Sequence, residues 1–505
     1  MGKNMKKLSM QSVIKIVVVA LLIWFFRPVF HGLFMVFVVS PLKGVLIVAL
    51  IAGLIMLLKK FGKISFVPVG VQNYTIKTSN NVSPAIVFGY IGVIILIMIA
   101  LNFETEIRYI LAAKQVSYEK RTDLPTFEPI RLIPKQVAKR YADDTFQNPQ
   151  EMLGDSQIAM VDGKLKRVFP RLPDGGILFF TNKLNGFVTA EVDTLDKKVG
   201  IEDQEFKYSE GIGVFDNLYY RLKLGRYNVD YSTEPIYLKN DKNEWVTVVP
   251  YIGYRGFLFT VPYWAAVVEI RSDGTMSDYT PEQTQEVSYF KNNRLYPKEL
   301  VNYYTDSYAY KGGLINKWFL HKNQTEIVAL TGSEKIFHVS TNEGFKQVVV
   351  AEPYGRSYGV YKIFIFDATT GKREIVEYDQ NSQLTGPVAA ADYIKREFPT
   401  YSWDAFSLAE PRPLKINNDL YWLLSIIPND AAGIAKTVLF DAKTNKVTGF
   451  DNVDTLSTFI KTGTVTVPAA ASQVTTDAVV DKNAEIKAKI DLIQKELDAL
   501  KELAK

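Results

Sequence analysis

A serine at a nucleophile-like spacing is the first candidate for chemistry. Residues 355–359 match the G-x-S-x-G elbow, in which Ser357 would attack an ester or amide carbonyl. That elbow requires a helix directly after the serine and a histidine later in the chain. Residues 360–366 are instead β-rich, and no histidine follows His338. We therefore interpret residues 355–359 as a hairpin loop.

Metal and acid–base chemistry also lack candidates. The three histidines, His31, His321 and His338, do not stand at metal-ligand spacing, and the chain has no cysteine. Asp143 and Asp144 are adjacent in a predicted helix, so their side chains diverge by about 100 degrees and cannot share a proton or a metal ion. No phosphate-binding or dinucleotide-binding loop occurs either. The sequence thus predicts a protein that is not an enzyme and has neither a cofactor nor a metal site.

Composition narrows the classes of partner. The chain has 505 residues, which is too long for a single typical domain. Its formal net charge is +5 and no basic block occurs outside the membrane flanks, so no nucleic-acid partner is expected. Long apolar runs stand before Leu101, whereas charged residues are spread through the remainder. We therefore expect a membrane region followed by a large folded region.

Three apolar stretches predict an integral membrane protein. They cover residues 13–30, 33–58 and 85–101, each near the length that an α-helix needs to cross a bilayer. Three consecutive stretches favour retained helices over a cleaved signal peptide. Pro41 and Lys43 interrupt the second stretch, so a kinked single crossing is expected there. If its two arms crossed separately, the region would have four spans.

Basic residues set the predicted orientation. Lysines are frequent before the first stretch and between the second and third, whereas the first connection has only Arg27 and His31. Under the positive-inside rule, the N-terminus and the 59–84 loop are cytoplasmic. Three crossings then place everything after residue 103 outside the cytoplasm, beginning with a connecting segment over residues 103–133. Four crossings would place the large domain inside.

A degenerate repeat organises the large domain. Residues 366–372 (FDATTGK) recur as residues 440–446 (FDAKTNK), each between two strand-like runs. Their Asp, Thr, Gly and Asn residues supply the local hydrogen bonds and the positive φ of a tight turn, which predicts a β-hairpin. Two weaker copies stand upstream. The predicted repeat turns are marked by Asp193, Asp273, Asp367 and Asp441, so the unit is roughly 75–95 residues long.

Each predicted turn follows a candidate helix and several strands. Pro134 opens an amphipathic helix before the first turn, and Pro387 opens another before the last. We therefore expect an α+β fold built from helix-on-antiparallel-sheet modules. The predicted modules cover residues 134–210, 211–290, 291–380 and 381–462.

This arrangement resembles the PepSY family of small helix-on-sheet modules. The resemblance rests on the helix Val388–Phe398, the strand Leu420–Ile426 and the strand and turn Val438–Val447, with Phe364–Glu374 as the next match. Members occur in peptidase propeptides and in membrane-anchored proteins of the bacterial envelope. The resemblance implies modules that bind or restrain partners, and it brings no catalytic residue.

The C-terminal residues predict a coiled coil behind a linker. Residues 463–480 are rich in Thr, Ala and Val without a helical period, as in a linker. Residues 481–505 then carry apolar side chains at alternating spacings of four and three residues. The predicted oligomerisation residues are Ile486, Ile490, Ile493, Leu497 and Leu500. Isoleucine at both core positions favours a homotrimer or homotetramer, and the alternative is a single helix docked on its own chain.

The apolar segment over residues 251–264 has two interpretations. We favour burial between modules, and the alternative is an exposed patch that contacts a partner or the membrane.

The function predicted from these features is that of a scaffold. We expect a non-enzymatic, membrane-anchored oligomer of a bacterial or phage envelope. Its ectodomain would bind an unidentified envelope protein, with the lipid bilayer and its own copies as further partners. The alternative is a regulator of an envelope peptidase, or an envelope hydrolase with an unrecognised site. A transporter subunit is disfavoured, because the predicted spans show no buried acidic residue.

Overall fold

The computed structural model describes residues 10–61, 64–68, 74–78, 84–328, 335–355, 359–379 and 384–464. The chain divides into two compact units, Met1–Thr448 and Gly449–Lys505. In the second unit, the described residues contain the helix α11 (Val453–Thr462). The predicted coiled coil, with all of its seam residues, and the linker after residue 464 lie outside the described residues.

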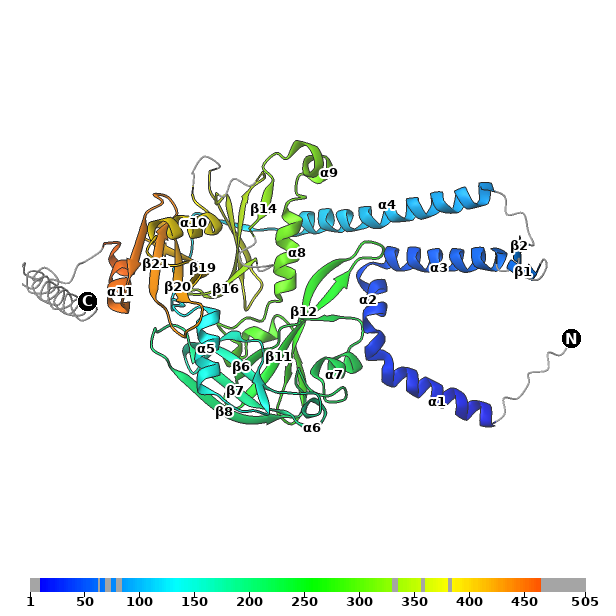
Figure 1. Ribbon diagram of the computed structural model, residues 1–505, viewed down its shortest axis with the longest axis horizontal. Helices are drawn as coiled ribbons and strands as arrows, with labels where there is room; N and C mark the ends of the chain where they lie inside the picture. Colours follow the sequence, from blue (N-terminus) through cyan, green and yellow to red (C-terminus); the bar gives the residue numbers. More distant parts are fainter. Residues whose placement is uncertain are drawn as a thin grey trace, which may run out of the picture. The chain divides into compact units, whose positions relative to one another are not determined.

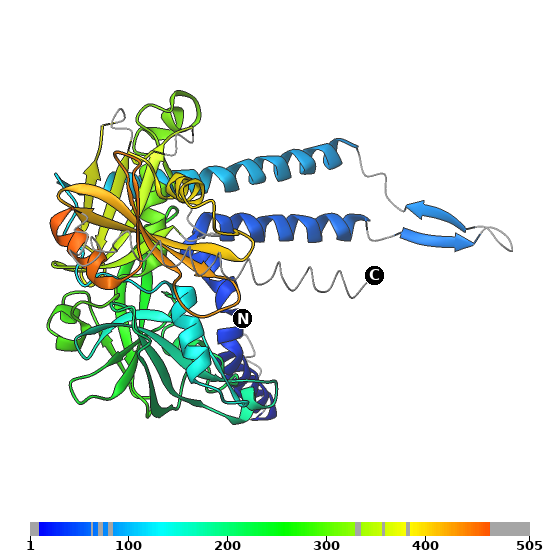
Figure 2. The same cartoon turned by 60° about the vertical axis from the view of Figure 1, so that its left-hand side comes forward.

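The N-terminal part of the first unit is helical (Figure 1 and Figure 2). Its elements are α1 (Met10–Phe26), the short helix η1 (Arg27–Phe30), α2 (His31–Val39), α3 (Pro41–Phe61), the hairpin β1 (Ile64–Pro68) and β2 (Tyr74–Thr78), and α4 (Pro84–Gln115). Two stretches, Val17–Val39 and Phe88–Gln115, are long and apolar enough to cross a membrane, and Pro41–Ile55 is a shorter apolar helix. Membrane anchoring through this region agrees with both stretches.

The predicted count of three or four full spans is not reached in the described residues, because the helices divide at a different place. The apolar pattern predicts a boundary between residues 30 and 33, but the chain stays helical there, through η1 into α2. The break falls at Ser40, whose φ of −141° and ψ of 74° are not helical. A proline disfavours helical geometry in the residue before it, and Pro41 follows directly.

Four sheets of four to six strands form most of the large domain, and each follows a helix. The first group contains α5 (Lys135–Thr145), β4 (Glu151–Leu153), β5 (Gln157–Val161), β6 (Lys164–Pro173), α6 (Leu178–Thr181), β7 (Leu184–Glu191) and β8 (Val199–Phe206). The second contains α7 (Leu218–Gly225), β9 (Asp230–Tyr231), β10 (Ile236–Lys239), β11 (Trp245–Arg255), β12 (Val261–Ile270), β13 (Met276–Tyr279), η2 (Gln283–Gln285) and η3 (Ser288–Phe290).

The other two groups repeat this order. The third contains α8 (Lys298–Tyr308), α9 (Gly313–Ile315), η4 (Asn316–Leu320), β14 (Thr325–Ile327), β15 (Ile336–Thr341), β16 (Gly344–Pro353), β17 (Lys362–Asp367) and β18 (Arg373–Glu377). The fourth contains α10 (Pro387–Glu397), β19 (Phe406–Ile416), β20 (Asp419–Pro428), β21 (Lys436–Asp441) and β22 (Val447–Phe450). We refer to the four groups as modules 1 to 4.

In every module the last four strands pair with their sequence neighbours as an antiparallel meander. The connecting segment adds one further strand, β3 (Glu119–Arg121), which pairs in parallel with β18. The predicted α+β class with antiparallel sheets is therefore confirmed. Such local pairing follows from short turns, since neighbouring strands joined by a tight turn can only run antiparallel.

Amphipathic helices cover the sheets. In module 1, Val137 and Ala142 of α5 pack in the same buried cluster as Phe169 of β6. In module 3, Leu300 of α8 packs in a cluster with Phe364 of β17. Each large side chain buried in this way contributes about 1.5–3 kcal/mol, so the helix and the sheet stabilise each other.

The apolar segment 251–264 forms the facing halves of β11 and β12 and the turn between them. Tyr251 and Val261 are buried in the sheet, whereas Phe257 and Leu258 at the turn are exposed. The segment therefore combines a buried base with an exposed apolar tip.

Candidate functional site

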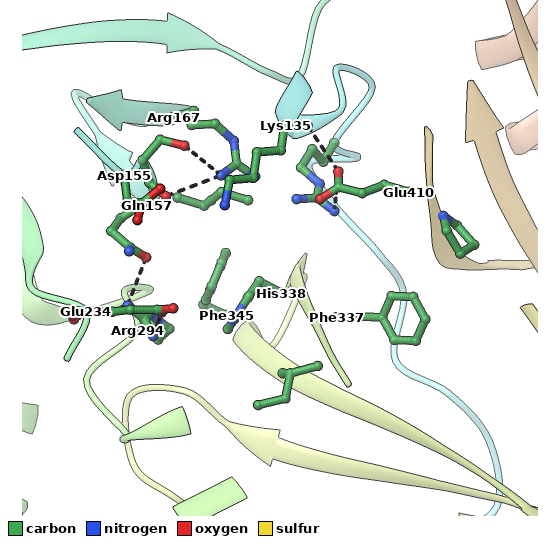
Figure 3. Close-up of a pocket in the computed structure, with 15 residues that line it drawn as sticks. Lys135, Asp155, Gln157, Arg167, Glu234, Arg294, Phe337, His338, Phe345 and Glu410 are labelled. Atoms are coloured by element: carbon green, nitrogen blue, oxygen red, sulfur yellow. Dashed lines mark hydrogen bonds and ion pairs between the residues drawn. The ribbon is translucent and has the colours of Figure 1, made fainter. Parts of the chain in front are cut away.

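All four modules contribute to one cavity of about 100 Å³ (Figure 3). Its cations are Arg131, Lys135, Arg167 and Arg294, and its carboxylates are Asp155, Glu234 and Glu410. The cavity is also lined by uncharged side chains, among them Ser156, His338, Phe337 and Phe345. Charged groups from segments far apart in the sequence thus meet in one place.

A repeated pentapeptide supplies two of these cations. Residues 131–135 (RLIPK) and 294–298 (RLYPK) share four of five letters, and each leads into a helix, α5 or α8. The backbone N–H groups of Leu132 and Ile133 donate to the carbonyl of Val192 at 2.7 and 3.1 Å. Those of Leu295 and Tyr296 both donate to Ala368 at 2.7 Å. Each copy is therefore fastened to the turn that ends β7 or β17 in its own module.

The arginine of each copy forms an ion pair with a glutamate of another module. Arg131 Nη2 lies 3.3 Å from Glu410 Oε2, at the irregularity midway along β19 in module 4. Arg294 Nη1 lies 2.9 Å from Glu234 Oε2 in module 2, and Lys298 pairs with the same carboxylate. Proline follows each glutamate in the sequence, at 235 and 411. In Figure 3, the Arg294–Glu234 pair and Glu410 lie on opposite sides of His338.

Electrostatics hold both glutamates ionised. Burial acts to raise the pKa of Glu410, but the charges of Arg131, Arg167 and Arg412 outweigh burial and lower the pKa to about 2. Burial opposes ionisation of Glu234 as well, and Arg294 and Lys298 nevertheless lower its pKa. Each pair is charged at neutral pH, so each functions as an ionic contact between modules.

Arg412 lies just outside the cavity and fixes the first pentapeptide. Its Nη1 donates to the carbonyls of Arg131 and Leu132 at 3.0 and 2.8 Å, and its Nη2 donates to Ser425 Oγ at 2.8 Å. Burial lowers the pKa of this guanidinium to about 9, with the charge of Arg131 acting in the same direction and Glu410 opposing both. This side chain ties the last sheet to the segment before α5.

His338 is neutral and lacks a hydrogen-bond partner at Nδ1 among the described residues. Burial is the main cause that lowers its pKa well below the usual range, and the charges of Arg294 and Arg131 add to it. Ser156 Oγ also lines the cavity, but it accepts a hydrogen bond from Arg167 at 3.1 Å. Within the described ranges no hydrogen bond joins Ser156 to His338, which is the contact by which a histidine activates a serine.

The cavity is large enough for water or a small anion. Four cations face three carboxylates, so most of the charge is compensated within the lining. A polar cavity of this size has room for a few water molecules. In the part of the chain that the structure describes, no group of three or more His, Cys, Asp or Glu side chains is placed to hold a metal ion.

A second charged cluster joins the N-terminal helices to the domain. Glu104 of α4 is fully buried, 3.2 Å from Lys43 of α3 and 3.7 Å from Arg108 one helical turn further on. Arg108 also donates to Ser40 Oγ at 3.0 Å and to the carbonyl of Thr260 at 2.8 Å. The Thr260 hydroxyl donates to the Val39 carbonyl. One network therefore connects the α2–α3 corner, α4 and the start of β12.

The sequence predicts no buried acidic residue in the apolar helices, and the buried Glu104 shows that this prediction is wrong. The last apolar stretch ends at residue 101 in the sequence, whereas α4 continues without a break to Gln115. An extra length of four turns carries Glu104 and Arg108 into the contact with the domain. The apolar run alone gave no sign of this continuation.

The bend at η1 is held by module 2. The Tyr220 hydroxyl donates to the carbonyl of Phe25, and that of Tyr227 to the carbonyl of Arg27, both at 2.7 Å. Arg27 donates in return to the Leu224 carbonyl. His31 Nε2 lies 3.1 Å from the carbonyl of Val229, so this nitrogen carries the proton and donates. His31 thus connects the start of α2 to module 2.

The predicted repeat-turn residues lie between strands. Asp367 Oδ1 accepts from the backbone N–H groups of Thr369 and Thr370 at 3.0 and 2.7 Å. Asp441 Oδ1 accepts from those of residues 443 and 444 at 2.9 and 3.2 Å. Asp273 lies in the β12–β13 turn and Asp193 in the β7–β8 connection. No hydrogen bond or ion pair joins any two of the four within the described ranges.

The sequence contained a usable sign of the cavity. The pentapeptide at 131–135 and 294–298 repeats four of five letters, but it leads into a helix and is therefore not part of the repeated turns between strands. Ser357 of the elbow-like match lies outside the described residues, and Gly355 and Gly359 lie in the β16–β17 connection. Neither a protein-family profile nor a curated protein sequence matches this chain.

Proposed function

We propose that this protein is a non-enzymatic, membrane-anchored scaffold of a bacterial or phage envelope, with its large domain outside the cytoplasm and binding protein partners. The observation that carries the proposal is the attachment of the helices to the domain. Glu104 is fully buried and the hydrogen bonds at η1 are partly buried, so the helices are part of the same structure rather than a flexible tether.

Three crossings by α1, α3 and α4 fit this arrangement. The helix α3 has 21 residues, which at about 1.5 Å per residue reach the thickness of the hydrocarbon core. It runs beside α4, where the Tyr90 hydroxyl donates to the Leu50 carbonyl at 3.2 Å. The nine-residue α2 is too short to cross, and its ends contact the domain through His31 and Val39. The lysine-rich N-terminus and 59–84 loop then lie in the cytoplasm.

A PepSY-like role supports partner binding. Each module has a helix followed by a four-stranded antiparallel meander, which is the arrangement on which the resemblance rests. Modules of that family bind or restrain partners, and the cavity at the module junction offers ionic contacts rather than catalysis. The heptads over residues 481–505 support self-association as a trimer or tetramer.

A hydrolase, or a regulator of an envelope peptidase, is the second candidate. The observation in its favour is the neutral His338 beside a cavity that Ser156 also lines. The observation against this candidate is that Arg167 already donates a hydrogen bond to the Ser156 hydroxyl oxygen.

Orientation is tested by labelling single cysteines, since the native chain contains none. An impermeant maleimide added to intact cells should label Lys242→Cys in the domain and should label Lys77→Cys only after permeabilisation. The reverse pattern would place the domain in the cytoplasm and overturn the proposal. Labelling of both sites only after permeabilisation would have the same consequence.

A further inference from the structure

Exposed apolar side chains of the large domain gather in three loops. Most of the large apolar residues that are exposed after residue 115 belong to them, and the remainder stand singly. We call these three loops the apolar rim. The first loop comprises residues 177–180 together with the neighbouring residues 214–215, the second comprises residues 257–258, and the third comprises residues 315–320. Ile177, Phe257 and Phe319 are 80%, 86% and 74% exposed. Exposure of this extent in aqueous solution is unfavourable, so a covering medium is expected.

Each loop of the rim touches one of the N-terminal helices. The Phe215 ring lies 5.3 Å from the ring of Phe25 in α1, and the Trp318 ring lies 5.7 Å from that of Phe103 in α4. The second loop, residues 257–258, is followed by Thr260, whose hydroxyl donates to the carbonyl of Val39 at the end of α2. In Figure 1, α6, the β11–β12 turn and α9 all lie on the side of the domain from which the helices leave.

Local structure keeps the rim side chains pointing outward. The Asn316 side chain closes the 316–322 loop, with Nδ2 donating to the Lys322 carbonyl at 3.1 Å and Oδ1 accepting from its N–H at 3.0 Å. His321 adopts φ 50° and stacks on Tyr354 at 3.9 Å. At the second loop, Gly256 has φ 123°, and a Cβ there would lie 2.3 Å from the Phe259 carbonyl oxygen. Residues 257, 319 and 320 are therefore presented by defined turns.

Basic side chains accompany the aromatic ones. Lys317 lies within the third loop, Arg255 just before the second, and Arg221 in α7 beside the first. Aromatic residues with flanking Lys or Arg are typical of the bilayer interface, where the rings sit among the headgroups and the cations reach lipid phosphates. A protein partner would not need three separate patches, each in contact with a spanning helix.

From these relationships we infer that the apolar rim inserts into the outer leaflet of the bilayer, so that lipid covers a whole face of the domain. The inference rests on the proposed crossing of the membrane by α1, α3 and α4. Three inserted loops would fix the orientation of the domain relative to the bilayer plane. With the helices alone, the tilt of the domain would depend on how those helices pack in the membrane. The rim would thus set the orientation of the large domain relative to the membrane.

Single-cysteine labelling of the full chain tests the inference. Phe180→Cys, Phe257→Cys and Phe319→Cys would carry a fluorophore, in vesicles of equal parts phosphatidylcholine and phosphatidylglycerol. We expect strong quenching by a lipid-borne nitroxide and several-fold weaker quenching by iodide than at the control Ile201→Cys. Ile201 is 46% exposed on β8, away from the rim. Circular dichroism of each variant verifies that it is folded.

A second control separates this inference from the proposed function. Leu96, 66% exposed on α4, should be quenched by the lipid-borne nitroxide if that helix crosses the membrane. Quenching at position 96 with iodide-accessible rim positions would overturn the inference alone. Absence of lipid quenching at position 96 would overturn the membrane crossing as well. Rim positions shielded from both quenchers would mean that protein covers them, which also rejects lipid insertion.

Discussion

Arg131 lies 3.3 Å from Glu410, and this pair joins the segment before module 1 to module 4. The second pentapeptide repeats the relationship, because Arg294 pairs at 2.9 Å with Glu234 of module 2. These equivalent pairs connect modules 1 and 4 and modules 2 and 3, even though each module has its own sheet and helix.

Replacing Glu410 by Gln should destabilise the domain by about 3 kcal/mol, because Arg131 and Arg412 would lose their buried counter-charge. Denaturant titration of the detergent-solubilised chain measures the change. Glu205→Gln is the matched control, since Glu205 pairs with Lys183 on the surface and should contribute no more than about 1 kcal/mol. Equal losses in the two variants would contradict an ionic role for Glu410.

Acid should weaken the same contact. The folded pKa of Glu410 is about 2, below its ordinary value of 4.5, so the unfolded state binds more protons between these values. Its contribution is complete above pH 4.5 and is lost as the pH falls toward 2. The stability of the wild type should therefore fall more steeply than that of Glu410→Gln over this range. Parallel profiles would show that other groups dominate acid unfolding.

His338 should impose a second pH dependence near neutrality. Its pKa is depressed in the folded state from an ordinary value of 6.5, mainly by burial, so only the unfolded state takes up this proton as the pH drops below 6.5. The stability of the wild type should decline from pH 7 to 5, and His338→Gln should flatten that decline. Val339→Ala, a neighbouring buried change without a titrating group, should lower stability equally at each pH. The prediction fails if His338→Gln keeps the wild-type slope.

Replacing Glu104 by Gln should loosen α4 from the domain, because Lys43 and Arg108 would lose the carboxylate between them. We expect a fall of several degrees in the unfolding midpoint and faster proteolysis within residues 116–133. Asn102→Ala on the same helix is the control, since among the described residues the hydrogen-bond partner of this exposed side chain is the Met98 carbonyl one turn before. Unchanged proteolysis in Glu104→Gln would remove the evidence for rigid attachment.

Replacing Ile493 by Lys should reduce the number of subunits in the solubilised particle. If the heptads pair between chains, each copy would place an uncompensated charge in the seam, at a total cost on the order of several kcal/mol. Mass measurement of wild type, Ile493→Lys and the outward-facing control Lys495→Ala would show the change. An unchanged mass would mean that the tail packs on its own chain or that the spanning helices hold the oligomer.

The sequence by itself determined the local features of this protein. Turn residues such as Asp367 and Gly371 bond and bend within a few positions, so the hairpins and the antiparallel class could be derived without knowing the rest of the fold. Apolar length likewise predicted a membrane region, because a helix long and apolar enough to cross a bilayer satisfies its backbone internally. The helix boundaries in this region were predicted at the wrong place, since η1 keeps the chain helical where a break was expected, and the break lies at Ser40.

Tertiary structure alone decided which distant groups meet. The pentapeptides at 131–135 and 294–298 were visible in the sequence, but nothing local indicated that one would pair with Glu410 and the other with Glu234. The same holds for Glu104, whose burial depends on where α3 and β12 lie. The physical reason is range: turn and helix signals act over a few residues, whereas ion pairing and burial depend on how whole modules pack against one another.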